Sequence, residues 1–353
     1  MCNMNCSYCF YRDETEKRKN AFCGLLSEET AETIVKKASS EAEESCFFMF
    51  QGGEPTLAGI EFYKYFVSLE KKYSKPGLRF FNAIQTNGYA INEEWARFFA
   101  ENSFLTGISV DGPADVHNMN RKSREGDGTF NKVMHTVDLF DKYKVDYNVL
   151  CVITSVNIKK AEKIYNFYSK RNLGYLQFIP CLEPLGEDKT TDMYAPDEKE
   201  YGDFLVKIFR LWFADLKKGK YVSIRHIDNF LRMFRGLPPE SCNMNGRCSV
   251  QFVTEADGTV YPCDFYCIDG YELGNIKEKS FSELAKSDNA VRFINESLPL
   301  PEECRQCRFY PFCRNGCRRD RAENGKTLYC GAYRRFFEEC GSELIAASRF
   351  LIK

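Results

Sequence analysis

Short apolar segments alternate with longer amphipathic ones through the first two thirds of the chain. The amphipathic stretches include residues 27–44, with Ser27 at the N-cap position, and residues 92–102, and both have helical periodicity. The apolar segments are strand-length and cover residues 46–50, 80–86, 105–110, 147–154 and 175–181. This alternation predicts βα units around a parallel sheet or barrel.

Polar or glycine-rich turns follow three of the expected strands: QGGEPT, NGY and DGP. Because the carboxyl ends of barrel strands carry the chemistry in such folds, we expect the functional residues there. A further apolar-alternating stretch at 221–227 precedes the turn RGLPPESC. We place the boundary at this turn, between a barrel of residues 1–235 and a second domain of residues 236–353.

Length and charge limit the classes of function. A chain of 353 residues is long for one ordinary core, which favours two domains. Lysine and arginine number 49 against 50 aspartates and glutamates, so no net field favours nucleic acid or an anionic membrane surface. The sequence shows neither an apolar run of about 18 residues nor a secretory signal pattern, which predicts a cytoplasmic protein.

The chain contains 17 cysteines, and their distribution is uneven. Three open the chain, and ten lie between Cys242 and Cys340. In a large chain without an export signal thiols stay reduced, so metal or cluster ligation explains them better than disulfides do.

The opening triplet of Cys2, Cys6 and Cys9 has the spacing C-x3-C-x2-C. Three thiolates do not complete a structural zinc site, and no histidine follows as a c-type haem would require. A 4Fe-4S cluster held by three cysteines leaves one iron open to bind a small molecule. On this motif alone, a zinc site or accidental spacing remains the alternative.

The triplet resembles the signature of the radical S-adenosylmethionine superfamily. That resemblance implies that the open iron binds the amino and carboxylate groups of S-adenosylmethionine and that Tyr8 lies against its adenine. It also implies that Gly52, Gly53 and Glu54 form the turn that receives the methionine amino group. Glycine there permits a close backbone approach, and an ordinary tight βα turn is the alternative.

The second cysteine group resembles the SPASM extension of peptide-modifying radical enzymes, through C-x2-C-x5-C-x3-C and the preceding G-x-V-x-P-C. The resemblance implies two fully ligated 4Fe-4S clusters suited to electron transfer, and a pair of zinc ribbons is the alternative. The first auxiliary set is Cys242, Cys248, Cys263 and Cys317, and the second is Cys304, Cys307, Cys313 and Cys330. The remaining cysteines are expected to be mostly buried thiols: Cys23, Cys46, Cys151, Cys181, Cys267 and Cys340.

Asp264 directly follows Cys263, where a carboxylate could take a proton as a neighbouring cluster takes an electron; a solvated turn residue is the alternative. Over nearly its whole length the chain resembles the anaerobic sulfatase-maturating enzymes, through CSYCFY, FQGGEPTLAG, QTNG, LQFI and YPCDFY. By that resemblance Asp264 is the general base, and Gln51 is a candidate substrate contact. The implied contacts to S-adenosylmethionine are Tyr8, Gly53, Ser109, Arg121 and Leu182.

The hydroxyl of Ser109 and the guanidinium of Arg121 are suitable donors for a carboxylate, although ordinary loop hydrogen bonding would use them too. The fold implied is α/β: a partial (β/α)6 TIM-like barrel, then a small cysteine-rich iron-sulfur (SPASM) domain and a C-terminal helix. The cofactors implied are three 4Fe-4S clusters, one binding S-adenosylmethionine and two auxiliary, and S-adenosylmethionine itself.

The reaction implied is oxidation of a cysteine or serine to formylglycine in an unfolded or nascent sulfatase peptide of the type C/S-x-P-x-R. A flavodoxin- or ferredoxin-like protein would donate electrons, and we expect a monomer with neither a nucleic-acid nor a membrane partner. Two alternatives stay open. One is a related peptide maturase that forms thioether crosslinks, and the other is a non-catalytic zinc-binding interaction module.

One departure from the family pattern concerns the first barrel strand, which should precede the triplet. Only Met1 stands before Cys2. Either the chain is truncated or its start was chosen late. If that strand is absent, we expect an exposed edge of the barrel and a poorly anchored cluster loop.

Overall fold

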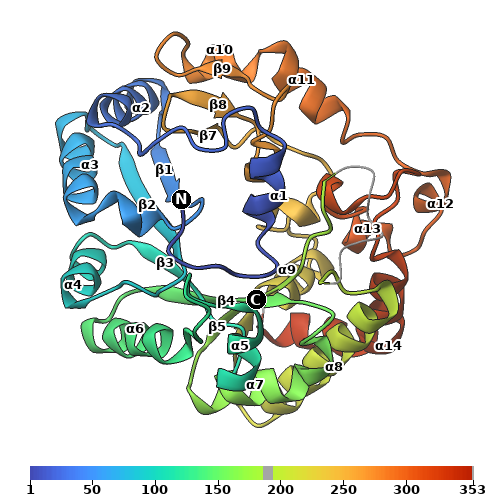
Figure 1. Cartoon of the computed structure of the whole chain (residues 1–353). Coiled ribbons are helices and arrows are strands. Elements are labelled where there is room, and N and C mark those ends of the chain that lie inside the picture. The colour runs from blue at the N-terminus through green and yellow to red at the C-terminus, as the bar shows by residue number, and fades with distance from the viewer. Residues whose placement is uncertain (186–193, 352–353) are drawn as a thin grey trace. The chain divides into compact units, whose positions relative to one another are not determined.

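The structure is a computed structural model that describes residues 1–185 and 194–351 (Figure 1). Its main sheet has the strand order β1-β2-β3-β4-β5-β6, and three short strands form a small antiparallel sheet in the order β7-β8-β9. The chain folds into two compact units, and neither is continuous in sequence. The first unit comprises residues 1–109, 121–147 and 250–294, and the second comprises residues 110–120, 148–249 and 295–353.

The first unit is built on parallel pairing of β1 with β2 and of β2 with β3. Figure 1 shows α2, α3, α4 and α6 along one side of these strands. Its α-helices are α1 (Phe10–Glu16), α2 (Glu28–Glu41), α3 (Ile60–Lys72), α4 (Glu93–Glu101), α6 (Phe130–Tyr143), α10 (Phe281–Ala285) and α11 (Asp288–Asn295). Its strands are β1 (Ser45–Phe50), β2 (Arg79–Thr86), β3 (Leu105–Ser109), β7 (Val253–Thr254), β8 (Thr259–Tyr261) and β9 (Gly274–Asn275), and its 3-10 helices are η1 (Pro55–Ala58) and η5 (Asp264–Tyr266).

Helix α2 begins where the sequence predicts. The Ser27 hydroxyl accepts a hydrogen bond from the backbone N–H of Thr30 at 3.1 Å, as an N-cap does. Ala31 and Val35, one turn apart, are buried in a core cluster with Phe66 and Leu69 of α3. One face of α2 thus packs on its neighbouring helix.

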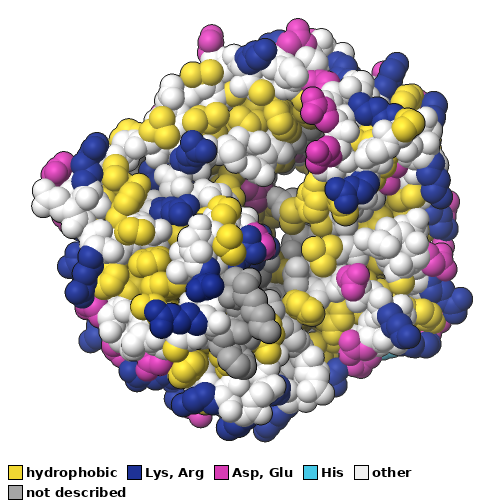
Figure 2. Space-filling model, turned by 180° about the vertical axis from the view of Figure 1, so that it is seen from behind, with side chains coloured by type: hydrophobic (Ala, Val, Ile, Leu, Met, Phe, Trp, Pro, Cys, Tyr) yellow, Lys and Arg dark blue, Asp and Glu magenta, His cyan; other side chains and the backbone are white. Residues whose placement is uncertain are grey.

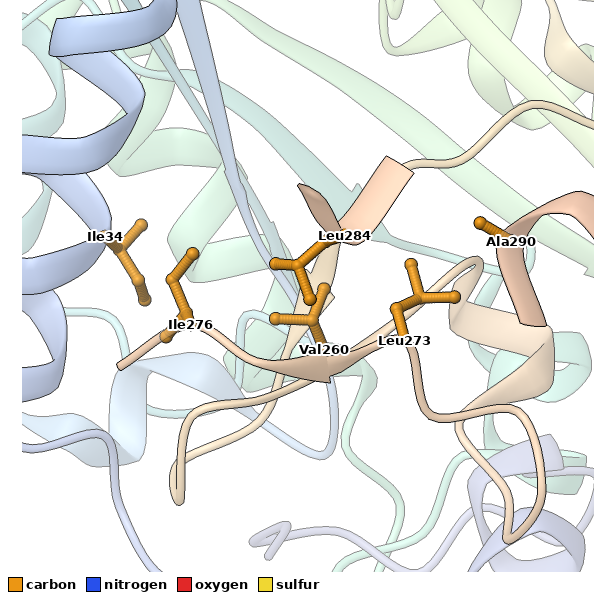
Figure 3. Packing of buried hydrophobic residues seen from close by; sticks show 6 residues of the cluster. All are labelled: Ile34, Val260, Leu273, Ile276, Leu284 and Ala290. Carbon is orange, nitrogen blue, oxygen red and sulfur yellow. The ribbon is translucent and has the colours of Figure 1, made fainter. Parts of the chain in front are cut away.

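Ile34 lies on a second face of α2 and packs on the segment 250–294 (Figure 3). Figure 3 shows its side chain turned towards Ile276. The buried members of this cluster are Ile34, Val260, Leu273, Ile276, Leu284 and Ala290. A segment from the cysteine-rich half of the sequence therefore shares a hydrophobic core with a helix near the N-terminus.

Polar contacts from α2 hold the same segment. The Lys37 ammonium donates to the carbonyl oxygens of Ile276 at 2.6 Å and Lys279 at 2.9 Å. The Glu41 carboxylate accepts from the backbone N–H groups of Phe281 at 2.9 Å and Ser282 at 2.8 Å, at the start of α10. One helical turn thus supplies a donor and an acceptor to consecutive parts of the loop.

The second unit contains the parallel strands β4, β5 and β6, with β5 paired to both others. Helix α14 packs along α8 and α9, where Phe230 lies 4.9 Å from Phe337 between ring centroids. Its strands are β4 (Tyr147–Ile153), β5 (Tyr175–Pro180) and β6 (Ser223–Ile224), and its α-helices are α5 (Ala114–Asn120), α7 (Ala161–Lys170), α8 (Glu198–Lys217), α9 (Arg225–Phe234), α12 (Glu302–Arg305), α13 (Tyr310–Cys313) and α14 (Cys330–Leu351). Its 3-10 helices are η2 (Ile158–Lys160), η4 (Cys242–Met244) and η6 (Arg318–Asp320).

These elements confirm the α/β class, the five expected strands and the C-terminal helix. The apolar-alternating stretch at 221–227 contains parts of two elements, because β6 ends at Ile224 and α9 begins at Arg225. Ile227, Phe230 and Leu231 are buried with the spacing of one helical face. A period of two and a period of 3.6 cannot be separated in so short a stretch, so its periodicity alone does not assign the element.

Surface charge agrees with the balanced composition. On the face shown in Figure 2, lysine and arginine side chains alternate with aspartate and glutamate side chains. Within residues 1–185 and 194–351, none of the helices combines the length and apolarity needed to cross a membrane.

Candidate active site

The cysteine triplet lies in the loop before α1 of the first unit. Cys9 occupies the N-cap position of α1, but its thiol makes no capping hydrogen bond. The sulfur of Cys2 accepts from the backbone N–H of Met4 at 3.4 Å and from Asn87 Nδ2 at 3.6 Å. Burial raises the pKa of the Cys2 thiol, the Met4 N–H lowers it, and Glu54 and Cys9 raise it further. Burial disfavours the charged thiolate of Cys2. Coordination of that thiolate by a metal would offset this cost, because the metal binds the deprotonated sulfur.

The cluster loop is held at several points, so the expectation of poor anchoring is wrong. The Glu54 N–H donates to the Met1 carbonyl at 3.0 Å, and the Asn5 N–H donates to the Lys122 carbonyl at 2.8 Å. Arg124 donates its Nε to the Cys2 carbonyl at 2.8 Å, and its Nη2 donates to the same oxygen. β1 is the terminal strand of the sheet, and the side chain of its Phe47 is exposed.

The turn after β1 contains Gly52 at φ 96° and Gly53 at φ 54°. A Cβ at Gly53 would lie 2.0 Å from the Met1 carbonyl oxygen, so only glycine fits there. The close approach thus involves the Met1 backbone of the cluster loop. A Cβ at Gly52 would meet no atom within 4 Å, which leaves open space beside that residue.

Glu54 is buried, and its carboxylate is saturated by protein donors. It accepts from the Asn87 N–H at 2.7 Å, and from the hydroxyls of Thr56 at 2.6 Å and Thr86 at 2.8 Å. Burial raises the pKa of Glu54, and these donors lower it. The carboxylate therefore joins the turn after β1 to the end of β2.

The other residues expected at S-adenosylmethionine divide between the units. In the first unit, the Arg121 guanidinium lies over the Tyr8 ring, 5.4 Å from its centroid. Ser109, at the end of β3, accepts a hydrogen bond from Gln85 Nε2 at 3.4 Å. Leu182 belongs to the second unit and is half-buried.

Asp264 also lies in the first unit, between two groups that contact its carboxylate. Gln51 Nε2 donates to Oδ2 at 2.9 Å, and the Cys263 thiol donates to Oδ1 at 3.2 Å. Burial raises the pKa of Tyr11 well above its ordinary value, and Asp264 and Glu14 are the next largest causes. Asp264 therefore lies near Gln51, Cys263 and Tyr11, at the start of η5.

The second auxiliary set of cysteines comes together in the second unit. Burial raises the pKa of Cys313 to about 11, the Asn315 N–H lowers it, and Cys330, Cys304 and Cys307 each raise it. Negative charge on the Cys313 thiol is therefore repelled by negative charge on each of the other three. This arrangement of four thiols fits a cysteine-ligated cluster.

Three members of the first auxiliary set also meet in the second unit. Burial and Asp320 raise the pKa of Cys317, and Cys248 and Cys242 raise it further. The fourth expected ligand, Cys263, belongs to the first unit, where it contacts Asp264.

The seventeen cysteines all lie in the described part of the chain and are thiols rather than disulfides. Of the six expected to be spare, Cys23 is half-buried, and the buried ones are Cys46, Cys151, Cys181, Cys267 and Cys340. Among the described residues, no three His, Cys, Asp or Glu side chains are arranged to hold a metal ion.

Comparison with known proteins identifies the family of this chain. A profile of the Radical SAM superfamily matches residues 1–168, and a profile of an iron-sulfur cluster-binding domain, SPASM, matches residues 242–308. A cysteine-type anaerobic sulfatase-maturating enzyme of Clostridium novyi is 44% identical, over 99% of this chain and 95% of that protein. This chain belongs to the anaerobic sulfatase-maturating enzyme family.

Two further relatives are similar to this chain over most of its length. The solved structure of native anSMEcpe with bound AdoMet and Kp18Cys peptide has a TM-score of 0.95 and 41% identity, over 99% of this chain and 97% of that one. A serine-type enzyme of Bacteroides thetaiotaomicron is 30% identical, over 96% of this chain and 86% of that protein. Membership brings 4Fe-4S clusters and S-adenosylmethionine as cofactors and confirms the expected fold.

Sequence reasoning missed two polar residues of this region, Tyr11 and Arg124. Asn87 begins the NGY turn after β2, where functional residues are expected, but the sequence assigns it no role of its own. Tyr11 follows the triplet and was visible only as an aromatic neighbour. No local pattern marks Arg124, whose partner Cys2 is 122 positions away.

Proposed function

We propose that this sulfatase-maturating enzyme oxidises a cysteine side chain of an unfolded or nascent sulfatase peptide to formylglycine. Asp264 carries the proposal, because its carboxylate is oriented by Gln51 and lies beside Cys263. Identity of 44% to a cysteine-type enzyme against 30% to a serine-type enzyme favours cysteine as the target. A peptide also accompanies AdoMet in the similar anSMEcpe structure.

The proposed division places the radical barrel in residues 1–235 and the auxiliary-cluster domain in residues 236–353. Cys2, Cys6 and Cys9 would hold the first cluster. The two auxiliary sets would be Cys242, Cys248, Cys263 and Cys317, and Cys304, Cys307, Cys313 and Cys330. When bound, the first cluster and S-adenosylmethionine supply a radical that removes hydrogen from Cβ of the target, and the auxiliary clusters supply an acceptor for one electron.

Asp264 would take the proton from the target sulfur. Loss of one hydrogen atom, one proton and one electron converts the C–S single bond to a thioaldehyde, which water hydrolyses to the aldehyde. Gln51 holds Oδ2 at 2.9 Å and so fixes the carboxylate in one orientation. Gln51 can also reach the peptide from this position, as a positioning residue.

S-adenosylmethionine would be held mainly by the first unit. Tyr8 offers a ring face for adenine, and Ser109 and Arg121 offer donors for the carboxylate. Gly52 and Gly53 would present backbone carbonyls to the amino group, with Glu54 fixing their turn. Leu182 is the remaining proposed contact to S-adenosylmethionine.

The remaining partners follow from the chemistry. A single-electron reductant of the flavodoxin or ferredoxin class would serve the first cluster, since the reaction needs one electron to begin. We further propose a cytoplasmic monomer. We propose no membrane or nucleic-acid partner, because the balanced charge provides no strong electrostatic field to attract either.

The test is anaerobic reconstitution with S-adenosylmethionine, a reductant and matched peptides carrying C-x-P-x-R or S-x-P-x-R, followed by mass spectrometry. We expect the aldehyde mass from the cysteine peptide at least tenfold faster than from the serine peptide. Deoxyadenosine formed without any peptide oxidation would contradict the sulfatase assignment. Equal rates would remove the preference for cysteine.

Asp264→Asn tests the base. It should still cleave S-adenosylmethionine but lose at least a hundredfold in aldehyde formation, the range that a general base contributes. Asp269→Asn is the matched control, since Asp269 is exposed in the same loop and accepts only the Lys19 N–H at 3.2 Å. Undiminished aldehyde from Asp264→Asn would exclude Asp264 as the base.

A further inference from the structure

Cys2 is held through both its sulfur and its backbone. Its sulfur accepts hydrogen bonds from the Met4 N–H at 3.4 Å and from Asn87 Nδ2 at 3.6 Å. Its carbonyl accepts from Arg124, with Nε at 2.8 Å. The position of the residue therefore depends on more than the single contact to Asn87, while the side-chain donor to its sulfur is Asn87.

Asn87 is held at its backbone N–H and at both the nitrogen and the oxygen of its side-chain amide. Its backbone N–H donates to Glu54 Oε2 at 2.7 Å, its Nδ2 also donates to Asn3 Oδ1 at 2.8 Å, and its Oδ1 accepts from the Tyr89 N–H at 2.9 Å. The residue is buried, so water does not compete for these bonds. The amide N–H is thus directed at the sulfur and has little freedom to turn away.

Glu54 supplies the fixed point for Asn87. Its carboxylate is only 3% exposed and accepts from the Thr56 and Thr86 hydroxyls as well as from Asn87. Charge-assisted hydrogen bonds from three residues restrict this carboxylate to one orientation. Glu54 thereby couples the turn after β1 to the residue that contacts Cys2.

We propose that Glu54 and Asn87 are positioning residues that direct an N–H donor at the Cys2 sulfur and so raise the reduction potential of the first cluster. Hydrogen bonds to ligand sulfurs are among the factors that set cluster potentials, because they stabilise the extra negative charge of the reduced state. The inference rests on the proposed role of Cys2 as a cluster ligand. It gives the buried glutamate a task distinct from direct contact with S-adenosylmethionine.

The test is an anaerobic redox titration of the reconstituted holoenzyme, followed by electron paramagnetic resonance. The first cluster is identified as the one whose spectrum changes when S-adenosylmethionine is added. Asn87→Leu removes the donor at similar volume. It should lower the ratio of reduced to oxidised first cluster at a fixed potential three- to tenfold, about 30–60 mV for one electron, with unchanged iron content.

Glu54→Gln should shift the ratio towards the reduced state less in the wild type than in the Asn87→Leu background. Loss of the Glu54 charge favours the reduced cluster in both backgrounds, whereas a weaker hold on Asn87 opposes this only where Asn87 is present. Equal shifts in the two backgrounds would show independent effects and contradict the relay. Asn5→Leu is the matched control. Asn5 has an exposed side-chain amide in the loop that contains Cys2, so this variant should leave the ratio unchanged.

The outcomes separate this inference from the function on which it rests. A wild-type protein without a cluster that responds to S-adenosylmethionine would overturn the proposed function. A responsive wild type whose fully loaded Asn87→Leu variant keeps the wild-type potential would overturn only the relay. Where Asn87→Leu binds less iron, Asn87→Asp decides, because it too lacks the side-chain N–H donor, and a wild-type potential in this variant with full iron overturns the proposal.

Discussion

Glu70 should make the stability of the first unit depend on pH. It lies on α3 with its side chain buried, and its Oε2 accepts from Asn82 Nδ2 at 3.1 Å. Its Oε1 is buried and has no hydrogen-bond partner among the described residues. Burial raises the pKa of Glu70 from 4.5 to about 7, and Asn82 and Lys71 only partly offset this.

The sign and size of the effect follow from linkage. Because the folded pKa is the higher one, the carboxyl costs nothing below about pH 4.5, and the cost grows as pH rises to about 7. The difference of about 2.5 pH units corresponds to at most about 3.4 kcal/mol, and partial screening by solvent reduces this to roughly 2 kcal/mol. Glu70→Gln, which stays neutral, should therefore be more stable than wild type by about this amount at pH 8.

Anaerobic thermal unfolding of wild type and variant at pH 5.5 and pH 8 measures the difference. For a chain of this length roughly 2 kcal/mol corresponds to a rise in Tm of about 3 °C at pH 8, with less than half of that at pH 5.5. Glu61→Gln is the matched control, since Glu61 is an exposed carboxyl on the same helix, bonded to Lys64 at 2.7 Å. An equal gain at both pH values, or none at pH 8, would refute a buried ionisable Glu70.

Two further predictions concern the segment 250–294 and the auxiliary clusters. Ile34→Ala should destabilise the protein by about 2–4 kcal/mol, the range for truncating a buried isoleucine, and should speed limited proteolysis within residues 250–294; unchanged proteolysis would mean that Ile34 does not hold the segment. Cys330→Ala should lower the iron content of the reconstituted protein from about twelve to about eight per chain, whereas Cys340→Ala, buried on the same helix, should leave it at about twelve. An equal loss of iron from both variants would show that Cys330 is not specifically a ligand.

Much of the site follows from residues that are near each other in sequence. The triplet, the two glycines after β1 and the Cys304 to Cys313 spacings are local patterns, and their ligand chemistry restricts what they can bind. Asp264 could be singled out for the same reason, since Cys263 precedes it. Its partner Gln51 could be identified only as a candidate substrate contact, because the hydrogen bond joins positions 213 residues apart.

The sequence by itself determined the strands and the N-cap at Ser27, because periodicity and capping are encoded within a few residues. Only the tertiary structure decided that Glu54 and Asn87 support the sulfur of Cys2 and that Ile34 packs against Ile276. It also decided that the apolar-alternating stretch at 221–227 passes from β6 into α9. These contacts join residues distant in the chain, and their stability comes from burial and from matched donors and acceptors, which no local pattern specifies.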